Sequence, residues 1–218
     1  MKNLTIKKID ISSPVSVQEA AQLLTNETDL ENVDILNWEK AYPYKPGVQF
    51  RIAHTGNEIW LKFYVQEKNI LAQETEINGD VYKDSTVEFF ISVDEGKNYY
   101  NFEFNCIGTP HVGYGPGRGN RTPILPEVIN QIDIESTLGN EPFEEKSGNF
   151  SWEMMICIPV QCFAFDKIEN LGGLKATANF YKCGDATSDP HFVTWNAVDT
   201  ENPDYHRPEF FGQINFEE

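Results

Sequence analysis

Residues 99–107 read Tyr99-Tyr-Asn-Phe-Glu-Phe-Asn-Cys-Ile107, and this stretch decides the fold class because its side chains alternate with a period of two. Such alternation is typical of a β-strand that packs one face on a core. The first face carries Tyr100, Phe102, Phe104 and Cys106, and the second carries Tyr99, Asn101, Glu103, Asn105 and Ile107. Carboxamides and carboxylates donate and accept hydrogen bonds at fixed positions, so the second face suits a polyhydroxylated ligand. The same row would also serve as the solvated face of an ordinary strand.

Length and charge narrow the functional classes. The chain has 218 residues, of which 40% are hydrophobic and 13% aromatic, enough for a sizeable core. It has 34 acidic and 17 basic residues, a formal net charge of −17. Such a chain repels phosphate backbones and anionic lipids, so nucleic acid and membrane surfaces are not expected as partners. We expect a neutral or cationic ligand.

Alternating runs separated by turn signals predict an antiparallel β-sandwich that forms one domain over residues 1–218, with a monomer favoured. The predicted strands are residues 4–11 (an edge strand), 33–37, 48–53, 58–66, 70–77, 86–93, 99–107, 129–134, 152–159, 174–182, 191–197 and 209–216. A short helix is predicted over residues 15–24, capped by Ser13 or Ser16, and a helical turn over 160–165. The glycine-rich residues 108–119 and the acidic residues 138–149 are predicted to be loops and turns.

The cysteines and the N-terminus carry no strong motif. Cys106, Cys157, Cys162 and Cys183 form no zinc spacing, so we expect buried thiols, with one disulfide as the alternative. The first ten residues lack the apolar segment of an export signal, and no run is long enough to span a membrane. As given, the chain would be cytoplasmic; a chain from which a signal had been removed would look the same and be extracytoplasmic.

Acidic residues and methionines offer candidates for three kinds of chemistry other than simple sugar binding. A glycoside hydrolase needs two carboxylates at the sugar bond, and Glu88 and Glu103 are predicted on one hairpin and nearly the same sheet face. A haem protein needs axial ligands, and one of Met154 and Met155 faces each side of its strand. Acidic loops at residues 185–189 and 199–204 could offer oxygen ligands to Ca²⁺, without an EF-hand spacing. Structural or solvated roles are the commoner outcome for all of these residues.

The C-terminal quarter is rich in flat rings and hydrogen-bond donors. It contains Tyr181, Trp195, Tyr205, His206 and Arg207. Sugars present apolar C–H faces and hydroxyl rims, so a ring below and amides or arginine at the edge is what their recognition needs.

With these residues in hand, the chain resembles the family 9 carbohydrate-binding modules, in a branch found in bacterial polysaccharide-degrading systems. The resemblance spans roughly residues 30 to 218 and is carried by four ordered motifs: Asp84-Ser-Thr-Val-Glu-Phe-Phe-Ile91, Tyr100-Asn-Phe-Glu-Phe-Asn-Cys-Ile-Gly108, Asn179-Phe-Tyr-Lys-Cys-Gly-Asp185 and His206-Arg-Pro-Glu-Phe-Phe-Gly212. It implies a jelly-roll or DOMON-like β-sandwich without catalysis, structural calcium, and a terminal sugar held between two aromatic rings. Trp195 matches the later ring; Tyr114, Tyr82 or Trp60 could supply the earlier one.

The function predicted from the sequence is therefore non-catalytic binding of a glycan end or short oligosaccharide, with no cofactor required. Trp195, Tyr181 and Tyr114 are predicted to stack on the sugar. The residues predicted to bond its hydroxyls or border the site are Glu103, Asn105, Asn179, Arg118, His206 and Arg207. Hydrolysis through Glu88 and Glu103, and haem binding, remain the alternatives.

Overall fold

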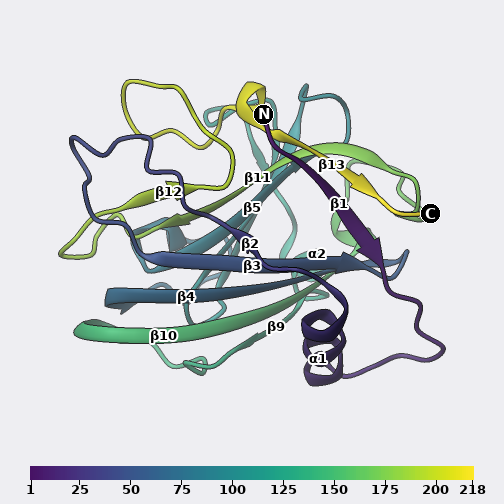
Figure 1. Cartoon of the computed structure of the whole chain (residues 1–218), viewed down its shortest axis with the longest axis horizontal. Coiled ribbons are helices and arrows are strands. Elements are labelled where there is room, and N and C mark those ends of the chain that lie inside the picture. Colours follow the sequence, from purple (N-terminus) through teal and green to yellow (C-terminus); the bar gives the residue numbers. More distant parts are fainter.

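The computed structural model describes residues 1–218 and consists mainly of strands arranged in two β-sheets (Figure 1). Sheet A has the order β8-β7-β6-β5-β11-β13-β1, with β12 beside β11. Its strands are β5 (Thr86–Ser92), β6 (Tyr99–Asn105), β7 (Pro110–Gly115), β8 (Thr122–Pro123), β11 (Lys175–Cys183), β12 (Phe192–Thr194), β13 (Gly212–Phe216) and β1 (Asn3–Lys8). The all-β sandwich predicted from the sequence is confirmed.

Sheet B has the order β1-β3-β4-β10-β9, with β2 beside β3. Its strands are β2 (Glu31–Asn32), β3 (Gly47–His54), β4 (Glu58–Ala72), β9 (Asp133–Ser136) and β10 (Phe143–Pro159). The inner faces of the two sheets enclose a core cluster of 38 buried residues. Residues 99–107 contribute Tyr100, Phe102, Phe104 and Cys106 to this cluster, as their alternation predicts.

Strand β1 belongs to both sheets, which corrects its prediction as an edge strand. Asn3–Ile6 pair in parallel with Gln213–Phe216 of β13, and Lys7–Lys8 pair in parallel with Ala53–His54 of β3. The sandwich is therefore not purely antiparallel. Parallel partners distant in sequence leave no turn signal between them, so local patterns do not reveal this pairing.

Two long strands replace shorter predicted ones. β4 runs unbroken from Glu58 to Ala72, where the sequence suggested one strand over 58–66 and another over 70–77. β10 begins at Phe143, although 138–149 was predicted to be a turn region, and pairs with β4 along most of its length (Figure 1). Glu67 and Asn69 interrupt the hydrophobic alternation, so the sequence does not indicate that β4 continues through them. Both point into the protein interior and are buried.

Other boundaries also differ from the prediction. The glycine-rich segment 108–119 contains β7, and the strand predicted over 129–134 is a short helix α2 (Pro126–Ile129) followed by β9. Residues 33–37 form only a single bridge, between Ile35 and Thr194. Three 3₁₀ turns complete the chain: η1 (Val81–Lys83), η2 (Val160–Cys162) and η3 (Pro208–Phe210). η2 confirms the helical turn predicted after Pro159.

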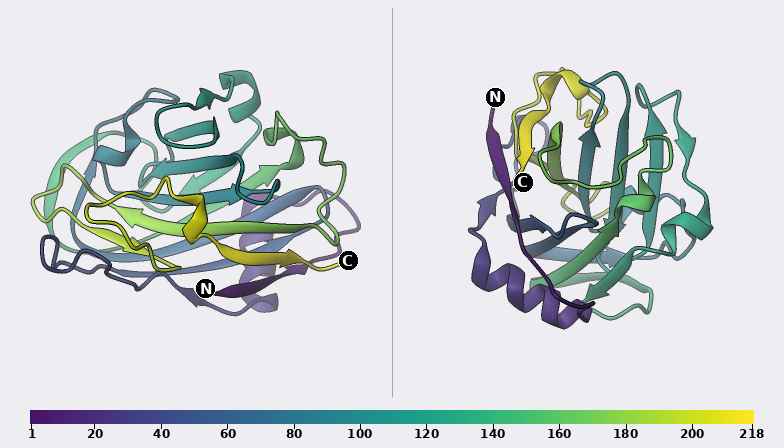
Figure 2. Two further views of the ribbon diagram at one scale, coloured as in Figure 1. Left: turned by 90° about the horizontal axis from the view of Figure 1, so that it is seen from above. Right: turned by 90° about the vertical axis from the view of Figure 1, so that its right-hand side faces the viewer.

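Helix α1 (Val17–Glu27) covers one end of the outer face of sheet B (Figure 2). Ser16 caps it: its Oγ accepts the backbone N–H of Glu19, and the Glu19 carboxylate accepts the N–H of Ser16. Ala20 and Leu24 then pack against Trp60. Neither helix has the length and hydropathy that a membrane crossing needs. All four cysteines are free and buried, as the buried-thiol prediction stated.

Candidate functional site

The outer face of sheet A is largely covered by loops, so the polar row of β6 is not open to solvent as a whole. Phe90, Tyr99 and Tyr181 of sheet A pack there under Tyr205 and Phe211 in a second hydrophobic cluster. Asn101 and Asn105 have no exposed surface. The prediction of an open, amide-rich sheet face is therefore wrong over most of its length.

The loops leave an opening over this face, a cleft with a volume of about 500 Å³, which is comparable with small-molecule sites. Glu88 of β5 and Glu103 of β6 lie directly opposite each other and line it. We call it the Glu88 cleft and define it by six lining residues: Tyr82, Glu88, Glu103, Arg118, Arg121 and His206. Chain segments distant in sequence thus meet over one β-hairpin.

Glu103 is held in place by its neighbours. The Asn101 amide donates to Glu103 Oε1 at 2.8 Å, and Arg121 Nη1 lies 3.8 Å from the same oxygen. Gly113 of β7 makes room for Asn101, because a Cβ at this position would lie 2.9 Å from Asn101 Oδ1. Arg121 Nη1 has no hydrogen-bond partner in the chain although it is buried. Its hydrogen-bonding capacity is therefore unused within the chain.

Burial sets the charge of the acidic lining. It raises the pKa of Glu88 well above its usual range, and the adjacent charge of Glu103 raises it further. The Cys183 thiol donates to Glu88 Oε1 at 3.1 Å, which opposes the rise. Burial also raises the pKa of Asp185, another lining residue, to about 6. A protonated Glu88 can donate as well as accept a hydrogen bond.

His206 forms part of the cleft wall as a neutral imidazole. Its Nδ1 lies 2.8 Å from the Tyr99 hydroxyl, and burial, aided by the nearby Arg121 and Arg118, lowers its pKa to about 2. Arg118 donates to Asp204 at 2.9 Å. His206 is therefore neutral and Arg118 is paired with Asp204, so neither side chain adds an unpaired charge to the cleft wall.

Aromatic surface borders the same opening. Tyr82 lies in η1 and is 40% exposed. Tyr42, Phe192 and Tyr205 also line the cleft. Tyr205 is stacked on Tyr181, with ring centroids 4.1 Å apart. The cleft thus combines ring faces with carboxyl, guanidinium and imidazole groups, an arrangement that can bind a ligand with both C–H faces and hydroxyl groups.

Three of the predicted site residues meet in this cleft: Glu103, Arg118 and His206. Trp195, expected to be the later stacking ring, does not. It is 1% exposed, lies in the main core against Phe50 and Phe180, and donates through Nε1 to Glu31. A ring so enclosed cannot stack on a sugar, so this prediction is corrected.

Three further predicted residues are buried in structural roles. Tyr181 lies beneath Tyr205 and donates to its carbonyl at 3.1 Å. Asn179 bonds the backbone of Asn196, and Asn105 bonds the Glu74 carbonyl and the Asp84 carboxylate. These side chains satisfy buried polar groups instead of facing a ligand, so their assignment to the site is also corrected.

The two remaining predicted residues lie outside the cleft. Tyr114 points to the inner side of sheet A, where it stacks on Phe165 with a centroid distance of 4.7 Å. Arg207 pairs with Glu209 on the surface at 2.6 Å. Tyr82 and Trp60 were the other candidates for the first of the two stacking rings. Trp60 is buried under α1, whereas Tyr82 lines the cleft.

Several lining residues were missed from the sequence, namely Tyr42, Asp80, His111, Arg121, Asp185 and Phe192. Asp185 lies in a motif and in an acidic segment that the sequence singles out, but there as a possible Ca²⁺ ligand. His111 lies in the glycine-rich segment 108–119, and Arg121 follows it. The remaining residues share no motif with these.

The alternatives weighed from the sequence fare differently. Glu88 and Glu103 are neighbours, as predicted, but residues directly opposite on paired strands lie on one wall, whereas a glycosidase needs carboxyls placed around the scissile bond. Met154 packs in the main core and Met155 packs beneath α1. No group of three or more His, Cys, Asp or Glu side chains is arranged to hold a metal ion.

The comparisons with known proteins agree with this architecture. Residues 18–216 match the model of carbohydrate-binding family 9. A proposed carbohydrate-binding protein from Bacteroides uniformis is 40% identical and superposes with a TM-score of 0.94 over 99% of both chains. No curated protein matches the chain.

Two solved structures of a family 9 carbohydrate-binding module from Caldicellulosiruptor kristjanssonii are more distant. The complex with glucose is 12% identical, with a TM-score of 0.62 over 99% of this chain and 96% of that one. The complex with cellotriose is 13% identical, with a TM-score of 0.58 over 99% and 94%. At these identities the likeness concerns the fold. With the family model matched over nearly its whole length, the chain belongs to carbohydrate-binding family 9.

Proposed function

We propose that this chain binds a glycan end or short oligosaccharide in the Glu88 cleft, without catalysis, as part of a polysaccharide-utilisation system. The observation that carries the proposal is the unpartnered Arg121 Nη1 beside the buried carboxyls, next to an exposed tyrosine ring. A donor without a partner is costly when buried, and a sugar hydroxyl would satisfy it.

The shape and chemistry of the cleft support a small saccharide. Its volume of about 500 Å³ is within the range of small-ligand sites, and it is enclosed on one side by sheet A. Tyr82 offers an exposed ring for C–H contacts, while Glu88 and Glu103 offer acceptors or, where protonated, a donor. The family also supports carbohydrate as the ligand class.

A glycan-array screen followed by calorimetric titration of the best glycan tests the proposal. We expect Arg121→Met and Tyr82→Ala each to weaken binding by about fivefold or more, because each removes one contact of roughly 1 kcal/mol. Matched controls are Arg207→Met, a surface arginine outside the cleft, and Phe165→Ala, an exposed ring outside it. The absence of any glycan binding, or equal losses in variants and controls, would contradict the proposal.

A further inference from the structure

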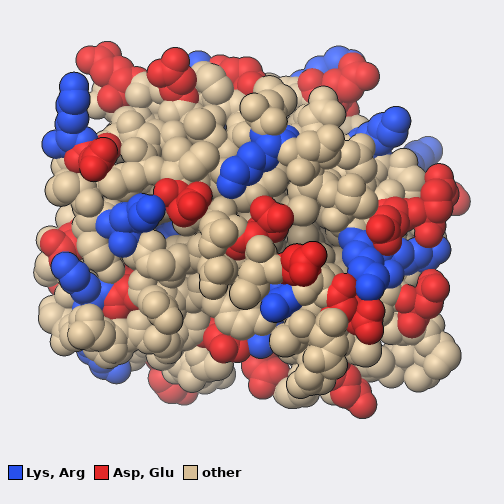
Figure 3. Space-filling view, viewed as in Figure 1, with Lys and Arg blue, Asp and Glu red and all other residues tan.

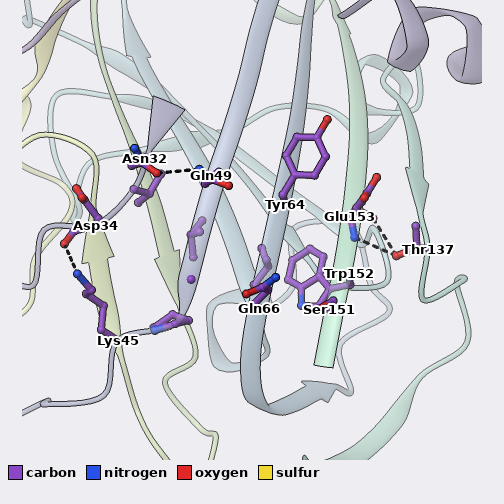
Figure 4. Close-up of a pocket in the computed structure, with 15 residues that line it drawn as sticks. Asn32, Asp34, Lys45, Gln49, Tyr64, Gln66, Thr137, Ser151, Trp152 and Glu153 are labelled. Carbon is purple, nitrogen blue, oxygen red and sulfur yellow. Dashed lines mark hydrogen bonds between the residues drawn. The ribbon is translucent and has the colours of Figure 1, made fainter. Parts of the chain in front are cut away.

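A second recess lies on the outer face of sheet B, on different strands from the Glu88 cleft. Its volume is about 530 Å³ (Figure 4). We call it the Gln66 groove and define it by Asn32, Gln49, Tyr64, Gln66, Ser151 and Glu153. These side chains come from β2, β3, β4 and β10.

Strand register places the groove residues in two rows. Gln49, Tyr64 and Glu153 are aligned across β3, β4 and β10. Gly47, Gln66 and Ser151 form the next row. Neighbouring strands are about 4.8 Å apart, so each row extends about 10 Å across the sheet. Helix α1 covers the face farther along, over Trp60 and Met155, and reaches the first row only at the Tyr64 hydroxyl, 3.4 Å from the Thr25 hydroxyl.

The charged side chains in and around the groove balance in number, with Lys45 and Lys62 against Asp34 and Glu153. Lys62 lies 2.8 Å from Glu153, and Lys45 donates to the Asp34 carbonyl at 3.2 Å. Acidic and basic side chains are also interspersed over the surface in the view of Figure 3. A groove without an excess of either sign favours an uncharged ligand, because a charged one would lose its hydration without gaining a counter-charge.

Hydrogen-bonding capacity in the groove is left unused. Gln66 and Ser151 are exposed and form no side-chain hydrogen bond within the chain. Gln49 donates to Asn32 at 2.9 Å through its amide nitrogen, which leaves its carbonyl oxygen free (Figure 4). The Tyr64 ring stands between the two flanking strands, part exposed, beside these amides.

From this arrangement we propose that the Gln66 groove is a second saccharide-binding surface, which takes an uncharged oligosaccharide chain. Carboxamide and hydroxyl groups match sugar hydroxyls, and the tyrosine ring matches a C–H face. The Glu88 cleft lies on sheet A and the groove on sheet B, so one glycan chain in each can be bound at the same time. The proposal does not depend on the cleft being a sugar site.

The full ¹⁵N-labelled chain, titrated with cellohexaose, xylohexaose, mannohexaose and laminarihexaose, tests the proposal by NMR. We expect at least one probe to shift the backbone amides of Gln49, Gln66 and Ser151 saturably. Gln66→Ala and Tyr64→Ala should each weaken this binding about fivefold. Arg121→Met should leave it unchanged while reducing any shifts at Glu88 and Glu103, so each site can fail alone.

A variant that fills the groove tests the proposal without removing any side chain that would contact the sugar. At Gly47 a Cβ would meet only ordinary contact, 3.5 Å from the Gln66 Cβ, so Gly47→Gln fills the groove without disturbing the strand. Gly117→Gln, at a loop glycine with open space around it, is the matched control. If none of the four probes shifts the groove amides, or if Gly47→Gln binds like Gly117→Gln, the proposal is overturned.

Discussion

Lys182 of sheet A and Glu67 of sheet B form a wholly buried ion pair, with 2.9 Å between Nζ and Oε2. The ammonium also donates to the Cys183 carbonyl at 2.7 Å and lies 2.8 Å from His191 Nε2. Trp152 Nε1 donates to the other Glu67 oxygen at 2.7 Å. The pair therefore joins the two layers through a polar network inside an otherwise apolar core.

Removal of either partner leaves an uncompensated buried charge. We expect Glu67→Gln and Lys182→Met each to lower the free energy of unfolding by about 3–5 kcal/mol, measured by urea denaturation. Lys7→Met is the control, because the Lys7–Glu27 pair is exposed and should change stability by at most about 1 kcal/mol. Equal effects in the buried and exposed variants would argue against this role.

Trp195 should act on stability and not on affinity. Trp195→Ala removes a buried indole from the core and is expected to lower the free energy of unfolding by about 3–5 kcal/mol. Trp195→Phe keeps more of the packing, so its folded chain should bind the glycan found by array screening as the unmodified chain does. Calorimetry on the folded Trp195→Phe variant decides: a clear loss of affinity would return this residue to the binding site.

Glu88 should give a pH-dependent contribution to stability. Because its folded pKa is raised above the usual value of about 4.3, the folded chain holds this proton more tightly than the unfolded chain. The stabilisation is present below about pH 4 and declines as pH rises through the folded pKa. Glu88→Gln should therefore gain stability relative to the unmodified chain between pH 4 and pH 8, in urea titrations.

A control of opposite sign is available for this experiment. Arg207 lowers the pKa of Glu209, so Glu209 stabilises the fold only when it is ionised. Its stabilisation is present above the unfolded pKa and is lost as pH falls through the lowered folded pKa, so Glu209→Gln should lose stability, relative to the unmodified chain, as pH rises to about 5. If Glu88→Gln follows the sense of Glu209→Gln, the environment described for Glu88 is wrong.

Removing the capping box of α1 should lower the stability of the fold by a small amount. Ser16→Ala removes the acceptor for the Glu19 N–H and should lower the free energy of unfolding by about 1 kcal/mol. Ser13→Ala is the matched control, since Ser13 is exposed and makes no hydrogen bond in the cap. Thermal unfolding followed by circular dichroism compares the two; equal melting temperatures would speak against the box.

The sequence predicted those parts of the fold that local patterning encodes. The alternation in β3, β5, β6 and β11 placed these strands correctly, because each has one face on the core. It did not reveal β1 between β13 and β3, since parallel pairing of distant segments has no local signature. The alternation also predicted two strands in place of β4. The inward-pointing Glu67 and Asn69 are hydrogen-bonded to Trp152 and Asp189, and partners so far along the chain cannot be read from a local pattern.

The candidate site was less predictable than the sheets. Motif residues such as Trp195 and Asn179 marked the right sheet but proved to be buried, because ring and amide content does not indicate which loops cover a face. The cleft depends on Arg121 and His206 converging on Glu103 from distant loops. Convergence of this kind follows from tertiary packing and not from spacing.

The parallel contact between β1 and β13 has a mechanical consequence. Asn3 pairs with Gln213 and Ile6 with Phe216, so the two chain ends leave this pair at opposite ends. Tension that pulls Met1 away from Glu218 thus acts along both strands, and their hydrogen bonds must break together. The Lys2 and Ile6 carbonyls accept from Gln213 and Glu217, so alternate residues of β1 bond β13, and Leu4 lies between them. In single-molecule stretching we expect one force peak, which Leu4→Pro should lower because proline cannot donate a backbone hydrogen bond. Under load, the terminal strands form a shear clamp that protects the two sheets behind them.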